Sequence, residues 1–334
     1  MSQKATIFLK NTLKAIIPLT IGILIFLWIY REIDIQAIQK ELQKDIHYMW
    51  IIIPLLLVTL GHIIRAIRWK QLIAPLGKTP KTSNLIYAIF VNYLMNLILP
   101  RMGEVTRCAI ISKSEKLPFS KVFGTLIIER IVDLLSLGII IIISFSFKMQ
   151  TIIQFLNQET EWTHKAIQTF SSIWLYIGLL ALGILCWIGY KLFKTNSFVR
   201  KIRNIGQNIL DGIKTIKLVK NKITFSTSTI LMWIVYFLQF YLCFFAFQFT
   251  ENLTFTQGLF IFVMANIGNI IPVQGGIGPW HFMVIHCMIL FRIDSVEAAT
   301  FALVVHGTQM IMTILLGIFG MIILTLNNKK YLNA

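Results

Sequence analysis

Long stretches with almost no charged residue recur along the whole chain. The clearest are residues 16–30, 50–64, 172–190, 225–249 and 299–328. A helix needs roughly 20 apolar residues to cross the hydrocarbon core of a bilayer, and so many stretches of this kind exceed what a soluble core of ordinary size can bury. The pattern therefore predicts an all-α polytopic membrane protein.

Two of the apolar regions are interrupted at their centres. Residues 100–103 (Pro-Arg-Met-Gly) and 272–279 (Pro-Val-Gln-Gly-Gly-Ile-Gly-Pro) contain helix-breaking residues, which membrane proteins tolerate where the backbone is buried in protein or lines a cavity. Each break predicts a re-entrant helical hairpin, so about eight hydrophobic elements comprise six spanning helices and two hairpins. The expected segments are 11–30, 48–64, 84–99 with 103–112, 122–147, 172–190, 224–247, 257–271 with 279–291, and 299–326.

The charges between these segments are distributed unevenly. Residues 65–81 hold five Lys or Arg and no acid, and residues 191–222 hold nine Lys or Arg and one acid. Loops 31–47 and 148–165 are balanced. Because basic loops stay on the cytoplasmic side, the protein is expected in a bacterial cytoplasmic membrane with both termini in the cytoplasm. The formal net charge of +17 then indicates attraction to anionic lipids rather than to nucleic acid.

The expected segments fall into two similar halves within a single membrane domain covering residues 1–334. Residues 1–147 and 172–326 each read as helix, helix, hairpin, helix, starting from opposite sides. An offset of 172 residues aligns Pro100 with Pro272 and Gly103 with Gly275, although chance matches remain an alternative. Inverted repeats with broken helices are typical of transporters, whose site lies where the two breaks meet. Between the halves, residues 197–219 predict a basic amphipathic helix on the cytoplasmic leaflet, or a linker helix packed on the protein.

Three charged residues lie within an otherwise apolar predicted span. Glu129, Arg130 and Asp133 would each cost roughly 2.5–3.5 kcal/mol or more at the bilayer centre if unpaired. On a helix, Glu129 and Asp133 share a face, and Arg130 can reach Asp133. They are expected to face the protein interior, either as a structural ion-pair cluster or as the lining of a headgroup or proton path.

Both predicted hairpin tips carry groups suited to anions. Arginine donates paired hydrogen bonds to phosphate, and exposed amides before a helix N-terminus bind anions. Tight turns and ordinary packing explain the same glycines and histidine equally well. The candidate residues are Arg101, Glu104 and Arg107 at the first tip, and Gly275, Gly276, Gly278 and His281 at the second.

Motifs for catalysis and cofactor binding are absent from the sequence. It contains no nucleophile elbow, P-loop, zinc-protease or dinucleotide fingerprint. Its four cysteines are scattered without ligand spacing, so neither a disulfide framework nor a metal site is expected. The chain is therefore not expected to be an enzyme or to bind a cofactor.

Three ordered motifs resemble a known family. Residues 100–107 (Pro-Arg-Met-Gly-Glu-Val-Thr-Arg), 129–133 (Glu-Arg-Ile-Val-Asp) and 272–278 are similar to the lysylphosphatidylglycerol synthase transmembrane region, also called the flippase-like or UPF0104 family. In full-length aminoacyl-phosphatidylglycerol synthases this region is the lipid flippase, and a separate cytosolic domain makes the lipid. The resemblance covers the transport half, so transferase activity is not expected here. Trp280 and His281 stand where the family often has an acid.

The resemblance implies a lipid flippase-like transporter for a phospholipid or polyprenyl-phosphate-type lipid. Its expected partners are membrane lipids with phosphate headgroups, while a separate lipid-modifying enzyme and a homo-oligomer stay open. The alternatives are a small-solute secondary transporter, a membrane-embedded transferase with a lipid-linked donor, and a scaffold for a lipid synthase. The expected headgroup path comprises Arg101, Glu104, Arg107, Glu129, Arg130, Asp133, Gly275, Gly276, Gly278 and His281.

Overall fold

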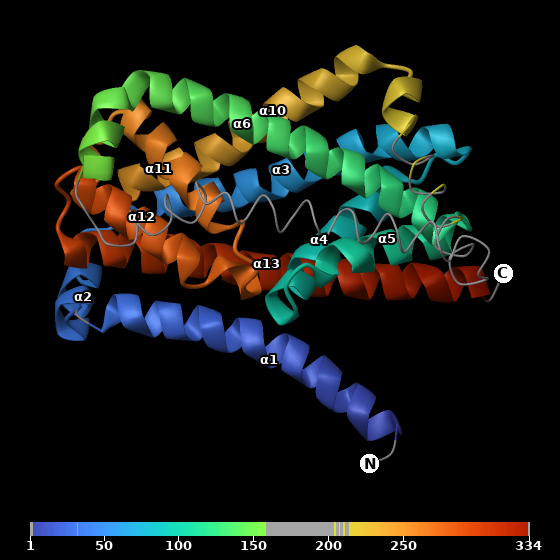
Figure 1. Ribbon diagram of the computed structural model, residues 1–334, viewed down its shortest axis with the longest axis horizontal. Helices are drawn as coiled ribbons and strands as arrows, with labels where there is room; N and C mark the ends of the chain where they lie inside the picture. Colours follow the sequence, from blue (N-terminus) through green and yellow to red (C-terminus); the bar gives the residue numbers. More distant parts are fainter. Residues whose placement is uncertain are drawn as a thin grey trace, which may run out of the picture.

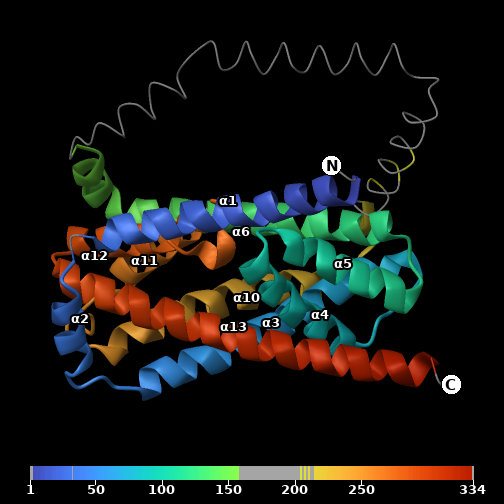
Figure 2. The ribbon, with the colours of Figure 1, turned by 90° about the horizontal axis from the view of Figure 1, so that it is seen from below.

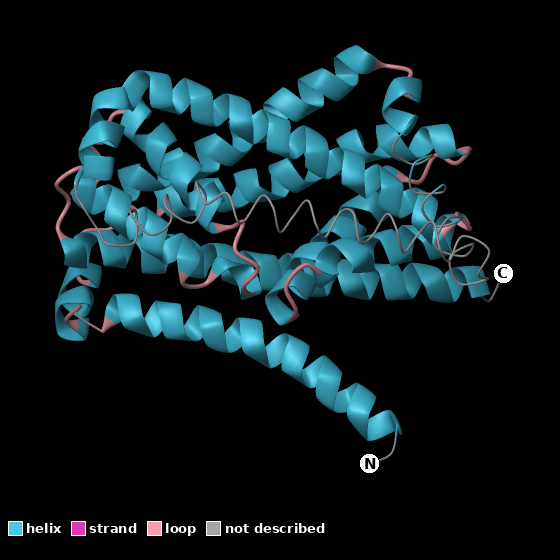
Figure 3. Ribbon diagram, viewed as in Figure 1, coloured by secondary structure: helices cyan, strands magenta, loops and turns pink. Residues whose placement is uncertain are grey.

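All regular secondary structure in the described part of the chain is helical (Figure 3). The computed structural model describes residues 3–31, 33–157, 204, 207, 210 and 214–332. The predicted span 172–190 and most of the predicted linker helix 197–219 lie outside these residues. The α-helices are α1 (Gln3–Tyr30), α2 (Ile35–Leu42), α3 (Met49–Ile73), α4 (Thr82–Ile98), α5 (Met102–Glu115), α6 (Phe119–Asn157), α10 (Lys222–Tyr241), α11 (Phe255–Gly268), α12 (Pro279–Leu290) and α13 (Ser295–Leu332). Short 3₁₀ helices are η1 (Ala74–Leu76), η2 (Thr215–Leu218), η3 (Leu242–Ala246) and η4 (Gln274–Gly276).

The longest helices run along the long axis of the molecule and carry apolar side chains on their outer faces. Helices α3, α6, α10 and α13 extend from one end toward the other (Figure 1). Three described stretches are long and apolar enough to cross a bilayer: Met49–Leu76, Lys222–Ala246 and Ser295–Asn327. Exposed leucine and isoleucine line α6 and α13, as expected for helices that face lipid. The prediction of an all-helical polytopic membrane protein is therefore confirmed.

The first hairpin consists of α4 and α5, joined by a very short tip. Arg101 occupies the left-handed region at φ 64° and turns the chain. The Gly103 amide donates to the Asn96 side chain at 2.8 Å. A β-carbon on Gly103 would lie only 1.9 Å from the Asn92 carbonyl oxygen, so the two helices can approach this closely only because residue 103 is glycine.

The second hairpin consists of α11 and α12, joined by a longer tip that contains η4. A capping box of Thr254 and Gln257 starts α11. Gly275, Gly276 and Gly278 turn the tip with positive φ angles, and Pro279 occupies the first turn of α12. Both predicted hairpins thus exist as helix pairs with the expected breaks.

The tips of the two hairpins meet near the middle of the molecule. Hairpin α4/α5 approaches from one end and α11/α12 from the other (Figures 1 and 2). The Arg101 guanidinium donates to the Ile270 carbonyl at 3.0 Å, and the Leu97 side chain packs over Gly275. The predicted inverted repeat and the number of spanning and re-entrant segments stay predictions.

The connections between helices separate by charge along the long axis. The α3–α4 connection, the α5–α6 connection, η2 and the C-terminal end of α13 lie at one end, and α2 lies at the other (Figures 1 and 2). The end with η2 carries Lys78, Lys81 and Lys116. The grouping of the loops agrees with the charge-based topology, and the assignment of this end to the cytoplasm stays a prediction.

Candidate anion-binding site

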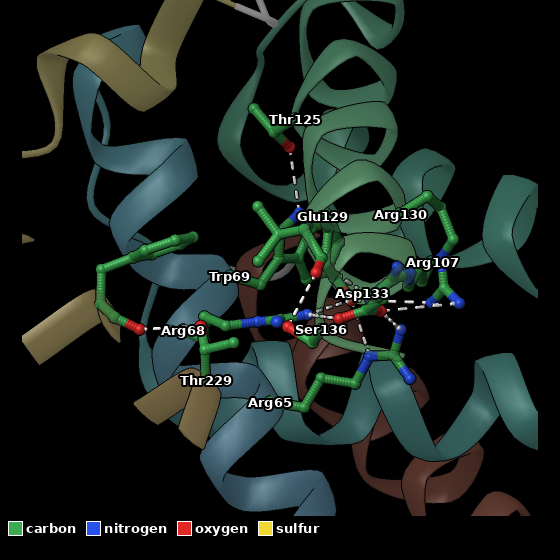
Figure 4. Close-up of polar contacts among 12 residues, drawn as sticks. Arg65, Arg68, Trp69, Arg107, Thr125, Glu129, Arg130, Asp133, Ser136 and Thr229 are labelled. Carbon is green, nitrogen blue, oxygen red and sulfur yellow. Dashed lines mark hydrogen bonds and ion pairs between the residues drawn. The ribbon is translucent and has the colours of Figure 1, made fainter. Parts of the chain in front are cut away.

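Two carboxylates on one face of α6 form the centre of a buried charged cluster. Glu129 and Asp133 are separated by four residues, so both point from α6 toward α3 (Figure 4). The Glu129 side chain is fully buried, and that of Asp133 is 14% exposed. Buried carboxylates of this kind require cationic partners.

Helix α3 supplies two of these partners. Arg65 Nε lies 2.7 Å from Glu129 Oε1, and Arg65 Nη2 lies 3.3 Å from Asp133 Oδ2. Arg68 Nη2 lies 2.6 Å from Asp133 Oδ1. Arg65 also donates to the Tyr93 hydroxyl of α4 at 2.6 Å. The two arginines are three residues apart, so a single face of α3 serves both carboxylates.

Helix α5 supplies a third buried arginine. Arg107 Nη1 lies 3.2 Å from Glu129 Oε2, and its guanidinium carbon lies 4.6 Å from the centre of the Trp69 ring. The Trp69 indole is itself held by a hydrogen bond to Thr125 at 3.0 Å. The first hairpin is thereby tied to α3 and α6 through the same charged cluster.

Arg130 lies at the edge of the cluster. Its guanidinium is 3.7 Å from Glu129 and 3.8 Å from Asp133, and its side chain is 35% exposed. The predicted neighbour relation between Arg130 and Asp133 therefore holds only as a long contact. Arg65 and Arg68 provide the principal pairing for the carboxylates.

The cluster holds more positive than negative charge. Four guanidinium groups surround two carboxylates, which leaves a formal surplus of two positive charges. Arg68 Nε and Nη1 and all three nitrogens of Arg107 are buried without a hydrogen-bond partner, so Arg107 Nη1 is within ion-pair distance of Glu129 but not aligned for a hydrogen bond. Buried donors without acceptors are costly. The cluster therefore holds more buried donors than its two carboxylates satisfy.

Comparison with known proteins identifies the family. The sequence matches the family described as Lysylphosphatidylglycerol synthase TM region over residues 15–317. This protein belongs to that family. A UPF0104 membrane protein of Methanocaldococcus jannaschii is 31% identical over 123 residues, 36% of each chain. One of Pyrococcus horikoshii is 24% identical over 145 residues, 42% of each chain.

A third relative is named as a glycosyltransferase. The glycosyltransferase AglD of Haloferax volcanii is 32% identical over 76 residues, which are 22% of this chain and 12% of that protein. The matches to the three curated relatives thus span less than half of their lengths. No solved structure matches this chain.

Two members of the cluster were not expected as site residues. The predicted second span ends at residue 64, which makes Arg65 and Arg68 loop charges. This prediction is wrong, because α3 continues to Ile73 and both side chains are buried. Two signals point to them in retrospect. Arg65 and Arg68 have the spacing of one helix face, and Glu129 and Asp133 need more cations than Arg130 alone supplies.

The other polar residues of the first tip lie outside the cluster. Arg101 binds the second hairpin through the Ile270 carbonyl. Glu104 is partly buried, and its Oε2 has no hydrogen-bond partner. Arg107, one turn further along α5, pairs with Glu129 on α6. Of the family motif at residues 100–107, Arg107 is thus the residue that joins the charged cluster.

Close packing surrounds the predicted residues of the second tip. A β-carbon on Gly276 would meet the Asn269 side chain at 2.3 Å, and one on Gly278 would meet the Gly22 carbonyl at 2.7 Å. His281 is buried among aromatic rings. Turn conformation and close approach thus account for the glycines. The anion-binding role of this tip stays a prediction.

Proposed function

We propose that this protein moves a membrane lipid with a phosphate headgroup between the leaflets of the bilayer, and that the headgroup binds at the cluster of Arg65, Arg68 and Arg107. The observation that carries the proposal is the surplus of buried guanidinium donors. Without a further anion, several of these donors stay desolvated and unpaired, which is expensive in a membrane interior.

Phosphate matches this cluster in charge and in geometry. A phosphodiester carries one negative charge and a phosphomonoester up to two, which offsets the surplus of the cluster. Guanidinium groups bind phosphate oxygens through pairs of parallel N–H donors. The free donors belong to Arg68 on α3 and Arg107 on α5, so a bound headgroup would link these two helices. Phospholipids and polyprenyl phosphates share this chemistry.

The two hairpins support movement rather than static binding. Their tips meet near the middle of the molecule through Arg101 and Ile270, an arrangement that transporters with inverted repeats use to expose one site alternately to either side. Arg107 lies on α5, directly behind the first tip. A shift of the first hairpin would therefore move Arg107, which is proposed to bind the headgroup, together with the contact between Arg101 and Ile270.

A transport assay with one substitution and one matched control tests the proposal. Purified protein is reconstituted into vesicles that contain fluorescent phosphatidylglycerol, and a membrane-impermeant quencher measures exchange between leaflets. Arg107→Met removes the guanidinium group that is proposed to bind the headgroup, but it keeps an unbranched side chain over Trp69. Lys113→Met makes the same kind of change at an exposed position in the last turn of α5.

Arg107→Met is expected to slow lipid exchange roughly tenfold or more, because a charge-assisted hydrogen bond contributes about 1.5–3 kcal/mol. Lys113→Met is expected to exchange lipid at the rate of the unsubstituted protein. Equal rates in the unsubstituted protein and Arg107→Met would contradict the proposal. Tight lipid binding without any exchange would favour a role in holding lipid for a partner enzyme.

A further inference from the structure

A second buried polar group lies where hairpin α11/α12 packs against α1 and α13. His281 of α12 and His306 of α13 have ring centres 4.6 Å apart and nearly perpendicular planes. Trp280 stacks on His306 at 4.8 Å, and Phe26 of α1 packs edge-on against His281 at 5.2 Å. Both histidines are buried.

One of these histidines holds the tip of the second hairpin. His306 Nε2 lies 2.9 Å from the Gly275 carbonyl oxygen. Because a carbonyl can only accept, Nε2 carries the proton and donates. The bond joins α13 to the turn whose glycines have positive φ angles. In the same tip, five residues before Gly275, the Ile270 carbonyl accepts from Arg101. The histidine pair is thus connected to the contact between the two hairpins.

The other histidine has one ring nitrogen without a partner. His281 Nδ1 is buried without a hydrogen-bond partner, and a desolvated imidazole nitrogen of this kind is uncommon in a folded protein. The titratable groups that face the pair, among the described residues, are the two imidazoles themselves and the Tyr30 phenol of α1. The Tyr30 hydroxyl is engaged with the Ala299 carbonyl at 3.1 Å. Among the described residues, no carboxylate faces the pair that could neutralise the positive charge of a bound proton.

We propose that the pair of His281 and His306 binds the proton whose movement drives lipid transport; this inference rests on the function proposed above. The proton adds to the lone pair of His281 Nδ1 on one side of the membrane and leaves from the same atom on the other, so nothing is consumed. Two imidazolium groups at this separation repel each other strongly, so the pair takes up one proton at a time.

Proton binding favours a different arrangement of the second hairpin. An imidazolium inside an aromatic, carboxylate-free environment is poorly solvated, whereas movement of α12 away from α13 would admit water. Such movement strains or breaks the bond between His306 and Gly275, and it alters the Arg101 contact on the first hairpin. The protonation state of the pair and the position of the first tip are therefore coupled through named contacts.

Vesicles with an imposed pH gradient test this inference. They contain the purified full chain and fluorescent phosphatidylglycerol, and the ratio of probe between the leaflets is measured with and without an ionophore that collapses the gradient. Coupling of one proton to one lipid supports a ratio of up to about tenfold for each pH unit. His281→Gln is expected to give the same ratio with and without the gradient.

The control is His286→Gln, the same substitution on the same helix at an exposed position, which is expected to retain gradient-driven accumulation. A pH-sensitive dye inside the vesicles measures proton entry on lipid addition to the unsubstituted protein, so the test stands even where His281→Gln fails to fold. Lipid exchange that is insensitive to the gradient and moves no protons overturns the inference but leaves the proposed function intact. Absence of any lipid exchange overturns both.

Discussion

At the scale of single residues, the buried cluster contains charges with different roles. Glu129 contacts Arg65 at 2.7 Å, Arg107 at 3.2 Å and Arg68 at 3.6 Å, so it is the common partner of three cations. Arg107 has Glu129 as its one ion-pair partner among the described residues, and its nitrogens lack hydrogen bonds. Glu129 therefore stabilises the fold, whereas Arg107 is the arginine that the proposed function assigns to the headgroup.

This difference predicts opposite effects on stability. Glu129→Gln leaves Arg107 without an ion-pair partner and leaves Arg65 and Arg68 with Asp133 as their one carboxylate. It should reduce the free energy of unfolding by roughly 3–5 kcal/mol, as for other broken buried pairs. Arg107→Met leaves Glu129 paired with Arg65 and should change it by less than about 2 kcal/mol. Thermal unfolding of the purified variants in detergent measures both. Equal destabilisation by the two substitutions would assign Arg107 a structural role.

The charged residues of α6 were predictable from the sequence, and their partners were not. Glu129 and Asp133 stand out because they interrupt an apolar span, which forces them to face the interior. Arg65 and Arg68 follow an apolar span and precede a basic loop, so charge counting merged them with that loop. Only the continuation of α3 to Ile73 shows that they are buried.

At the scale of elements, both hairpins could be predicted because proline and glycine break apolar sequence in a way that few other residues can. The ends of the helices were less well predicted. Helix α6 extends from Phe119 to Asn157, well beyond the predicted 122–147, because polar residues such as Lys148 and Gln150 are compatible with a helix that leaves the bilayer.

Close contact between α4 and α5 predicts a stability difference between two glycines. A β-carbon at Gly103 would meet the Asn92 backbone at 1.9 Å, whereas one at Gly138 on α6 would meet nothing within 4 Å. Gly103→Ala should lower the free energy of unfolding by about 1–3 kcal/mol or more. Gly138→Ala should be neutral or should stabilise by up to about 1 kcal/mol.

Chemical denaturation of both alanine variants, compared with the unsubstituted protein, checks this pair. Destabilisation by Gly138→Ala equal to that by Gly103→Ala would mean that the hairpin does not depend on the close approach. Lipid exchange should fall in Gly103→Ala as well, since displacement of α5 moves Arg107 away from Glu129.

At the scale of the whole molecule, loop charges predicted which connections lie together. The charge of each loop is counted separately. The α3–α4 connection keeps Lys78 and Lys81, so it stays basic although Arg65 and Arg68 belong to α3. The meeting of the two tips was inferred only by analogy with inverted repeats, because a contact between Arg101 and the Ile270 carbonyl leaves no trace in local sequence.

Cysteine labelling from either side of the membrane tests this topology. Single cysteines introduced at Lys78 and Ser114 should react with impermeant reagent only from the cytoplasm, and one at Asn252 only from outside, because basic loops are retained inside. The described native cysteines, at positions 108, 243 and 287, are buried. Labelling of position 114 from outside would require α4 and α5 to cross the membrane as one continuous span.

Recognition of a lipid phosphate by the buried arginines can be measured with the purified protein. The most direct measurement is native mass spectrometry of the purified protein offered equal amounts of phosphatidylglycerol and diacylglycerol with identical acyl chains, since these lipids differ only in the headgroup. The unsubstituted protein should retain phosphatidylglycerol roughly tenfold more than diacylglycerol, and Arg107→Met should lose this preference. Equal retention of both lipids by the unsubstituted protein would contradict the account.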